Sequence, residues 1–169
     1  MVRPNETETR GGGVNAGKSV VIGAEEGVSY WQPNPARGYV TVKLTPDNMP
    51  LDTFSSGTQV LFPGASVRPH GHMRNHELVF VYKGQGTAVI DDIKYPIEPG
   101  VTLLFMRNSV HLIENTGEEE MRLFWIFMPP GLEEWFAAIG LKRDPKFPAP
   151  PPFSVPEGIE EARGRQRFI

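Results

Sequence analysis

The chain has 169 residues and a formal net charge of −3, a length typical of a single domain. The slightly acidic charge gives no electrostatic basis for binding nucleic acid, and the absence of cysteine excludes disulfide scaffolds, iron–sulfur clusters and cysteine-ligated zinc. The 18 glycines and 17 prolines exceed the usual share and favour many turns over long helices.

The first segment, residues 1–17, is polar and rich in glycine. It has no hydrophobic period, so we expect it to be flexible, and it has no apolar run that could form the core of a signal peptide. Apolar runs elsewhere in the chain fall far short of the ~20 residues of a membrane-spanning helix. We therefore expect a soluble, cytoplasmic protein without a membrane partner.

Residues 18–128 contain short runs rich in β-branched and aromatic residues, separated by proline, glycine, asparagine and aspartate. The runs cover 39–44, 58–62, 77–82, 87–90, 101–105, 110–113 and 122–128. This spacing predicts an all-β domain of short antiparallel strands, either a sandwich or a barrel. A jelly roll is one closed solution of this kind.

Residues 129–169 form a C-terminal region with one predicted helix at 131–139. The helix carries apolar residues at helical spacing, and Gly140 is a plausible stop. We expect this stripe to pack on the outside of the barrel. Its members are Leu132, Trp135, Phe136 and Ile139.

The segment 144–156 is rich in proline and follows the predicted helix. Such a composition predicts an extended arm without a core of its own. The arm is either solvated or wrapped around a neighbouring subunit.

The histidines indicate a metal site. Three of the four lie close together in the chain, at His70, His72 and His76. Residues two apart on an extended strand point to the same face, so His70 and His72 can present both imidazoles to one point. Glu77 follows closely, and antiparallel pairing can bring His111 alongside from a later strand.

Each candidate ligand also has a structural interpretation. A lone pair of histidines two residues apart is more often exposed on the surface, and a lone histidine such as His111 is often a core residue. Strict alternation from His72 favours His76 over Glu77 as the inward side chain. A bulge or turn at 73–75 would reset the alternation and turn Glu77 inward.

Residues 64–84 resemble the first motif of the cupin superfamily, G-x5-H-x-H-x4-E-x6-G. Every fixed position of this motif is present. They are Gly64, His70, His72, Glu77 and Gly84.

The second cupin motif, G-x5-P-x-G-x2-H-x3-N, is matched in part. Gly100, His111 and Asn115 agree with it. Asn108 replaces a glycine, a mild change because asparagine enters positive φ readily. Met106 replaces a proline and removes a rigid turn constraint ahead of His111.

The resemblance implies a double-stranded β-helix, the jelly-roll barrel of single-domain cupins, with the short helix and proline-rich arm appended. It also implies a metal site of His70, His72, Glu77 and His111, with His76 either behind the ligands or an alternative ligand. Three imidazoles and one carboxylate suit a borderline divalent cation, which can be iron, manganese, nickel, copper or zinc, rather than calcium or magnesium. Among these the resemblance makes iron the first expectation.

The resemblance further implies an enzyme, and the first expectation is a non-heme Fe(II) dioxygenase acting on a small aromatic or dicarbonyl-like substrate. One alternative is an isomerase, decarboxylase or lyase that uses the metal as a Lewis acid. Another is a non-catalytic barrel that binds a small molecule. We also expect a homodimer, because single-domain cupins often pair through sheet edges and such pairing covers exposed strands.

Several aromatic side chains on or beside the predicted strands suit an apolar pocket. Half of the aromatics on any strand face away from its interior, so the pattern leaves open which of them line it. The candidates are Phe62, Phe80, Tyr82, Phe105, Trp125 and Phe127.

Overall fold

The structure is a computed structural model that describes residues 19–159 together with 162, 164, 168 and 169. The predicted flexible segment 1–17 lies outside the described residues. No helix within the described part of the chain is long and apolar enough to cross a membrane.

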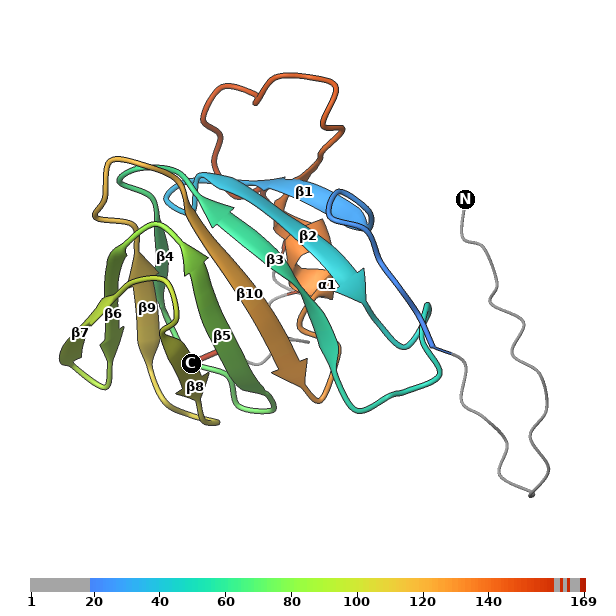
Figure 1. The fold of residues 1–169 in the computed structure, drawn as a ribbon, viewed down its shortest axis with the longest axis horizontal. Coiled ribbons are helices and arrows are strands. Elements are labelled where there is room, and N and C mark those ends of the chain that lie inside the picture. Colours follow the sequence, from blue (N-terminus) through green and yellow to red (C-terminus); the bar gives the residue numbers. More distant parts are fainter. Residues whose placement is uncertain (1–18, 160–161, 163, 165–167) are drawn as a thin grey trace.

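Two antiparallel sheets make up the molecule (Figure 1). The larger has seven strands in the order β11-β1-β2-β3-β10-β5-β8, and the smaller has four in the order β4-β9-β6-β7. The elements are β1 Val28–Gln32, β2 Gly38–Leu44, β3 Ser55–Leu61, β4 Ser66–His70, β5 His76–Lys83, β6 Gly86–Ile90, β7 Ile93–Ile97, β8 Thr102–Phe105, β9 His111–Glu114, β10 Met121–Met128, α1 Glu134–Ile139 and β11 Leu141–Lys142.

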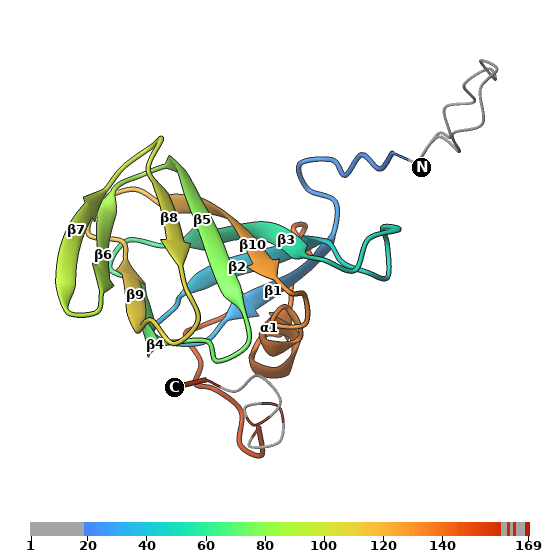
Figure 2. The same ribbon diagram turned by 90° about the horizontal axis from the view of Figure 1, so that it is seen from below.

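Seen from below, the two sheets face each other across a common interior (Figure 2). The all-β prediction is confirmed, and the architecture is a double-stranded β-helix. All seven predicted runs overlap a strand, whereas β1, β4, β7 and β11 were missed. Strand β7 contains Pro96 and lies at a sheet edge, the one place in a sheet where proline is readily accommodated.

Strand β10 lies at the centre of the larger sheet, between β3 and β5. Its residues alternate strictly between buried and half-buried, which places Trp125 and Phe127 on the inner face. Gly57 on β3 pairs with Trp125, and a Cβ at Gly57 would clash with the indole ring. A glycine at this position therefore lets the indole lie against the neighbouring strand.

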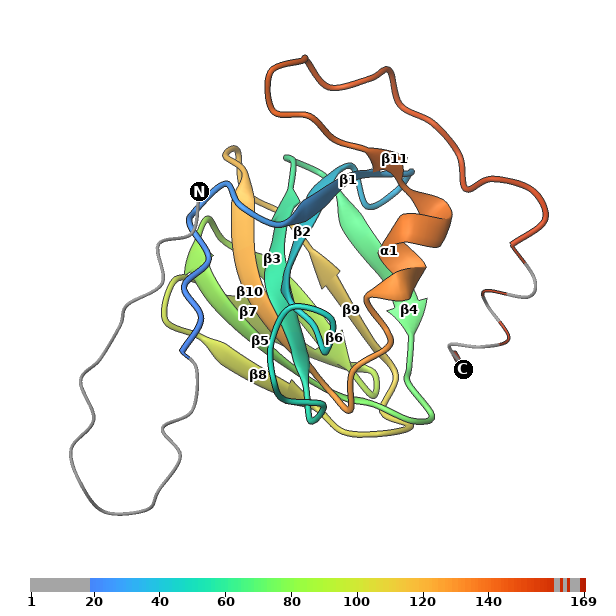
Figure 3. The same cartoon turned by 90° about the vertical axis from the view of Figure 1, so that its right-hand side faces the viewer.

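The helix α1 is shorter than predicted and lies elsewhere. It begins at Glu134, because Leu132 and Glu133 form a turn that the Glu133 carboxylate holds by accepting hydrogen bonds from the Gly131 N–H and the Ser55 hydroxyl. The expectation that its apolar stripe packs on the outside of the barrel is wrong. The helix lies beside β1 (Figure 3), and the stripe faces the interior instead.

The apolar stripe of the helix faces inward because the two sheets leave a gap on this side of the barrel. β4 is an edge strand of the smaller sheet, and β1 is paired on its outer side only with the two residues of β11. The interior is open along this side, and an apolar helix face covers it more favourably than it would cover a polar outer wall.

The proline-rich arm has no helix or strand of its own, as predicted. It returns to its own barrel, where the Asn34 N–H donates a hydrogen bond to the Phe153 carbonyl at 2.8 Å. Pro150 and Phe153 share a small hollow with Trp31 and Phe62. Part of the arm is thus packed against its own barrel and not fully solvated.

Candidate metal centre

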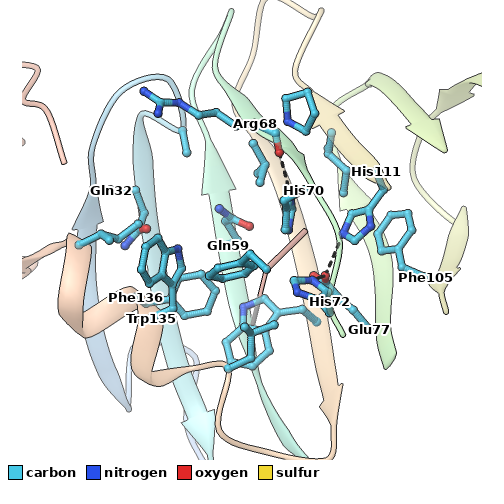
Figure 4. Close-up of a pocket in the computed structure, with 18 of the residues that line it drawn as sticks. Gln32, Gln59, Arg68, His70, His72, Glu77, Phe105, His111, Trp135 and Phe136 are labelled. Carbon is cyan, nitrogen blue, oxygen red and sulfur yellow. Dashed lines mark hydrogen bonds and ion pairs between the residues drawn. The ribbon is translucent and has the colours of Figure 1, made fainter. Parts of the chain in front are cut away.

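The four predicted ligands come together between the two sheets (Figure 4). His70 ends β4 and pairs directly with His111, the first residue of β9 in the smaller sheet. Glu77 lies on β5 of the larger sheet, and His72 lies in the connection that follows β4. The site therefore bridges the two sheets, and only the closed fold assembles it.

Two local irregularities set the directions of these side chains. A register shift in β4 between Val67 and His70 places His70 opposite His111. A bend at Met73 and Arg74 then resets the alternation before β5, as the spacing predicted. Glu77 consequently faces inward.

Distances within the group are short. His72 Nε2 lies 3.0 Å from Glu77 Oε2, and His111 Nε2 lies 3.4 Å from the same oxygen. One ligand atom from each of the four residues, His70 included, falls within 4.8 Å of the others. His72 and His111 are each only 2% exposed. The four atoms are thus close enough to share one ion.

Backbone carbonyls fix the tautomers of two histidines. His70 Nδ1 donates to the Arg68 carbonyl at 2.8 Å, and His111 Nδ1 donates to the Ser109 carbonyl at 3.0 Å. Each imidazole is thereby left with its Nε2 lone pair free for a metal. Phe105 stacks on His111 with a centroid separation of 3.8 Å and fixes its plane.

The protonation states also suit a metal. Burial and the neighbouring His111 lower the pKa of His70 to about 4, so the imidazole is neutral at pH 7. Burial raises the pKa of Glu77, but the close approach of His111 and His72 outweighs it and lowers the pKa to about 2. Glu77 is therefore ionised, and the group offers the neutral nitrogen of His70 together with one carboxylate.

The structure supplies a further test of whether a cation fits. His72 Nδ1 and His111 Nε2 are buried without a hydrogen-bond partner in the described part of the chain. Buried polar atoms in this condition are uncommon, and a bound ion is one explanation for them. A divalent ion among the four residues would satisfy His111 Nε2. The donor set of three imidazoles and one carboxylate fits a borderline divalent cation.

His76 does not join the group. It neighbours Glu77 on β5, so its side chain leaves the opposite face of the strand. Its Nδ1 accepts a hydrogen bond from the Arg107 N–H at 3.3 Å. The structure thus places the alternative ligand outside the metal group.

The two departures from the second motif have structural explanations. Asn108 has a φ of 65°, the left-handed conformation that its motif position requires. The turn that leads to His111, which lacks the proline, is held instead by Asp91, whose carboxylate accepts hydrogen bonds from the Ser109 hydroxyl and the Val110 N–H. Asp91 was missed as a contributor to the site. The sequence marked it only as a turn residue.

A cavity of about 290 Å³ adjoins the metal group between the sheets and α1. Among the predicted pocket aromatics, Phe105, Trp125 and Phe127 line it. Phe80 and Tyr82 are exposed. The helix contributes Trp135, Phe136 and Ile139 to the same wall, and Leu132 in the turn before the helix joins them.

Phe168, near the end of the chain, covers the metal group from the outside and was not foreseen. Gly71 and Ile169 exchange two backbone hydrogen bonds, and His72 forms a β-bridge with Phe168. The Phe168 ring lies 5.6 Å from His72 and 4.9 Å from Trp135, measured between centroids. It adds apolar surface directly over the ligands.

Known proteins support the assignment of this fold and motif set. The family model of the cupin domain matches residues 57–127. Protein SchB of Streptomyces halstedii is 33% identical over 98 residues, which cover 57% of this chain and 71% of SchB. L-ectoine synthase of Teredinibacter turnerae is 34% identical over 80 residues, 46% of this chain and 58% of that protein.

The solved structure of KdgF from Halomonas sp. is similar in fold, with a TM-score of 0.57 at 16% sequence identity. The match covers 69% of this chain and 97% of KdgF. The chain belongs to the cupin superfamily as a single-domain member, as its two motifs predicted.

Proposed function

We propose that this cupin is a metal-dependent dioxygenase that uses Fe(II) and acts on a small, largely apolar aromatic or dicarbonyl-like substrate. The observation that supports it most is the lining of the cavity. Among the described residues that form this lining, no acid or base side chain lies outside the four-residue group, apart from Arg68, which stays protonated.

Lewis-acid isomerases, decarboxylases and lyases move protons to and from carbon by means of a positioned acid or base. Among the described lining residues, the candidates for this role are the metal ligands themselves. A dioxygenase requires less of the protein. The substrate supplies all the electrons and receives both oxygen atoms, so no separate electron donor is needed, and the one proton that a hydroxyl or diketone substrate loses on binding the metal can pass to water.

Individual residues of the chain have defined roles in the proposed dioxygenase reaction. A ferrous ion, when bound, supplies the redox chemistry toward dioxygen, and four protein ligands leave up to two octahedral positions for reactants. The neutral His70 and the ionised Glu77 would hold the ion without first losing a proton. Phe105, Phe127 and Phe168 surround the site with rings and limit the access of water.

A second candidate is a metal-dependent lyase or isomerase. The relative L-ectoine synthase, 34% identical over 80 residues, favours it. In that case the ion polarises a substrate oxygen, and dioxygen has no part in the reaction.

Oxygen uptake separates the two candidates. Protein purified without a tag is loaded anaerobically with Fe(II) and tested against a panel of catechols, hydroxyquinones and 1,3-diketones. We expect one dioxygen to be consumed per substrate, with both atoms of ¹⁸O₂ recovered in the product, while zinc-loaded protein is inactive. Equal turnover without oxygen would contradict the dioxygenase and support the lyase. Metal loading without any turnover would favour a binding protein.

A further inference from the structure

Gln59 is a polar residue in an otherwise apolar part of the cavity wall. It lies on β3, where it pairs with Val40 on β2 and Leu123 on β10. Both neighbours are buried apolar residues, and Leu123 lines the cavity beside Gln59. Figure 4 shows the Gln59 side chain inside the cavity, between Gln32 and His70 in this view.

The Gln59 amide has no hydrogen bond to any other described residue, yet none of its polar atoms is sealed off from the cavity. An amide that lies among apolar side chains without a protein partner can bond only to water or to a ligand. A leucine would suit this position better if it served only the core. The amide is thus available to something that enters the cavity.

The residues around Gln59 limit the kind of ligand group that its amide can bind. Gln32, another amide in the lining, is 4% exposed, and its Nε2 donates to the Tyr30 carbonyl at 3.4 Å. Arg68, on β4, is exposed. Apart from Arg68, the described lining beyond the metal group carries no ionised side chain, so a cationic ligand group would be unpaired beside Gln59 and an anionic one could pair only with the exposed Arg68. A primary amide offers both donors and an acceptor, which match a neutral hydroxyl or carbonyl.

We propose that Gln59 forms a hydrogen-bonding subsite for the far end of the substrate. The preferred substrate is then a planar, uncharged ring compound with one oxygen function at the metal group and a second hydroxyl or carbonyl at Gln59. This inference rests on the proposed function, because it takes the substrate to occupy the cavity beside the metal. It adds the requirement that the substrate carry two oxygen functions separated by an apolar ring system.

The test compares two fluorescent probes, 2,6-dihydroxynaphthalene and 2-naphthol, which differ only in the second hydroxyl. Binding is measured on zinc-loaded protein, because zinc has no redox chemistry and leaves the probes intact. The proteins are wild type, Gln59→Leu and Thr58→Val. Thr58 is the neighbour of Gln59 on β3 and points to the opposite face of the sheet, so it is a matched control.

We expect wild type and Thr58→Val to bind the dihydroxy probe about fivefold more tightly, the factor of one neutral hydrogen bond. Gln59→Leu should lose this preference while keeping its zinc content and affinity for 2-naphthol. An unchanged preference in Gln59→Leu, or a wild type that shows none, overturns the proposal. Gln59→Met replaces the leucine variant if that variant does not fold.

Failure of the subsite and failure of the proposed function are distinguishable. Zinc content and oxygen uptake test the metal centre and its reaction, and neither requires a second hydroxyl on the probe. The ratio of the two affinities tests Gln59 alone, since no turnover takes place.

Discussion

The two ends of the barrel interior are built from the same strands, but one end is filled with side chains and the other surrounds the cavity. At the closed end, Leu61 and Val81 are fully buried beside Met121, and none of the three lines the cavity. At the open end, Glu77 and Trp125 continue the same strands along the cavity wall. Strand alternation alone therefore directs side chains inward, without deciding whether they fill the core or surround a cavity.

Buried polar groups show the same contrast. Asn115, at the closed end, is fully buried, and its Nδ2 donates to the carbonyls of Leu61 and Glu119 while its Oδ1 accepts the Gly117 N–H. His72 and His111, at the open end, each retain one ring nitrogen without a hydrogen-bond partner among the described residues. The satisfied Asn115 stabilises the fold, whereas these unpaired nitrogens are available to a ligand. The predictions below test this division.

The largest expected effect is on stability, from Leu61→Ala at the closed end. The cavity left in a tightly packed region should lower the free energy of unfolding by about 2–5 kcal/mol. Urea unfolding measures this loss, and metal content per folded chain should be unchanged. A variant that lost metal without losing stability would break the division between the two ends.

Asn115→Ala should cost less, about 1–3 kcal/mol, because the carbonyl of Leu61 is left buried without its donor. Again we expect a shift of the urea midpoint with metal binding retained. If metal affinity falls as much as stability does, Asn115 acts on the site, and the closed end is not independent of it.

Asp91→Ala tests the turn that positions His111. We expect metal affinity to fall about tenfold, the lower end of the range for residues that orient ligands. Asp92→Ala is a matched control, since both residues have positive φ and bear the same backbone strain, while only Asp91 contacts Ser109 and Val110. Competition with a zinc-sensitive dye measures both affinities. Equal losses would mean that backbone strain alone weakens the site.

A smaller effect is expected on the stability of the metal-free protein as the pH changes. The pKa of His70 is about 4 when folded and 6.5 when unfolded, so the unfolded chain binds more protons between these values. Stability from this group is complete above pH 6.5 and is lost as pH falls toward 4. Glu77, with a folded pKa of about 2, adds a further loss below pH 4.5.

Urea midpoints of protein treated with EDTA, measured between pH 7.5 and 4.5, test this. His70→Gln should remove the part of the decline that falls above pH 4.5. If that variant declines as steeply as wild type, His70 is not the group that titrates.

The sequence predicted more of the metal group than of the cavity. His70, His72, Glu77 and His111 follow from fixed spacing within motifs, and the replacement Asn108 could be judged from backbone preference. Strand β4 was missed because Arg68 and Pro69 interrupt any β pattern. Residues whose roles depend on local spacing in the chain could thus be predicted from the sequence.

Long-range features were not predictable. Leu132 and Trp135 lie on an apolar stripe whose partner surface the pattern cannot specify, and Phe168 reaches the site from a part of the chain far from the ligands. Alternation along β3 turns Gln59 toward the interior, but only the folded structure shows that its amide faces a cavity.

Metal content tests the central claim most directly, in protein purified without an affinity tag. Wild type, His72→Ala and His76→Ala are compared by elemental analysis after loading with Fe(II) or zinc, His76 being the histidine that the structure places outside the group. We predict about one metal per chain in wild type and His76→Ala, as a single site requires, and little in His72→Ala. Metal-free wild type, or equal loss in both variants, would contradict the assignment of this centre.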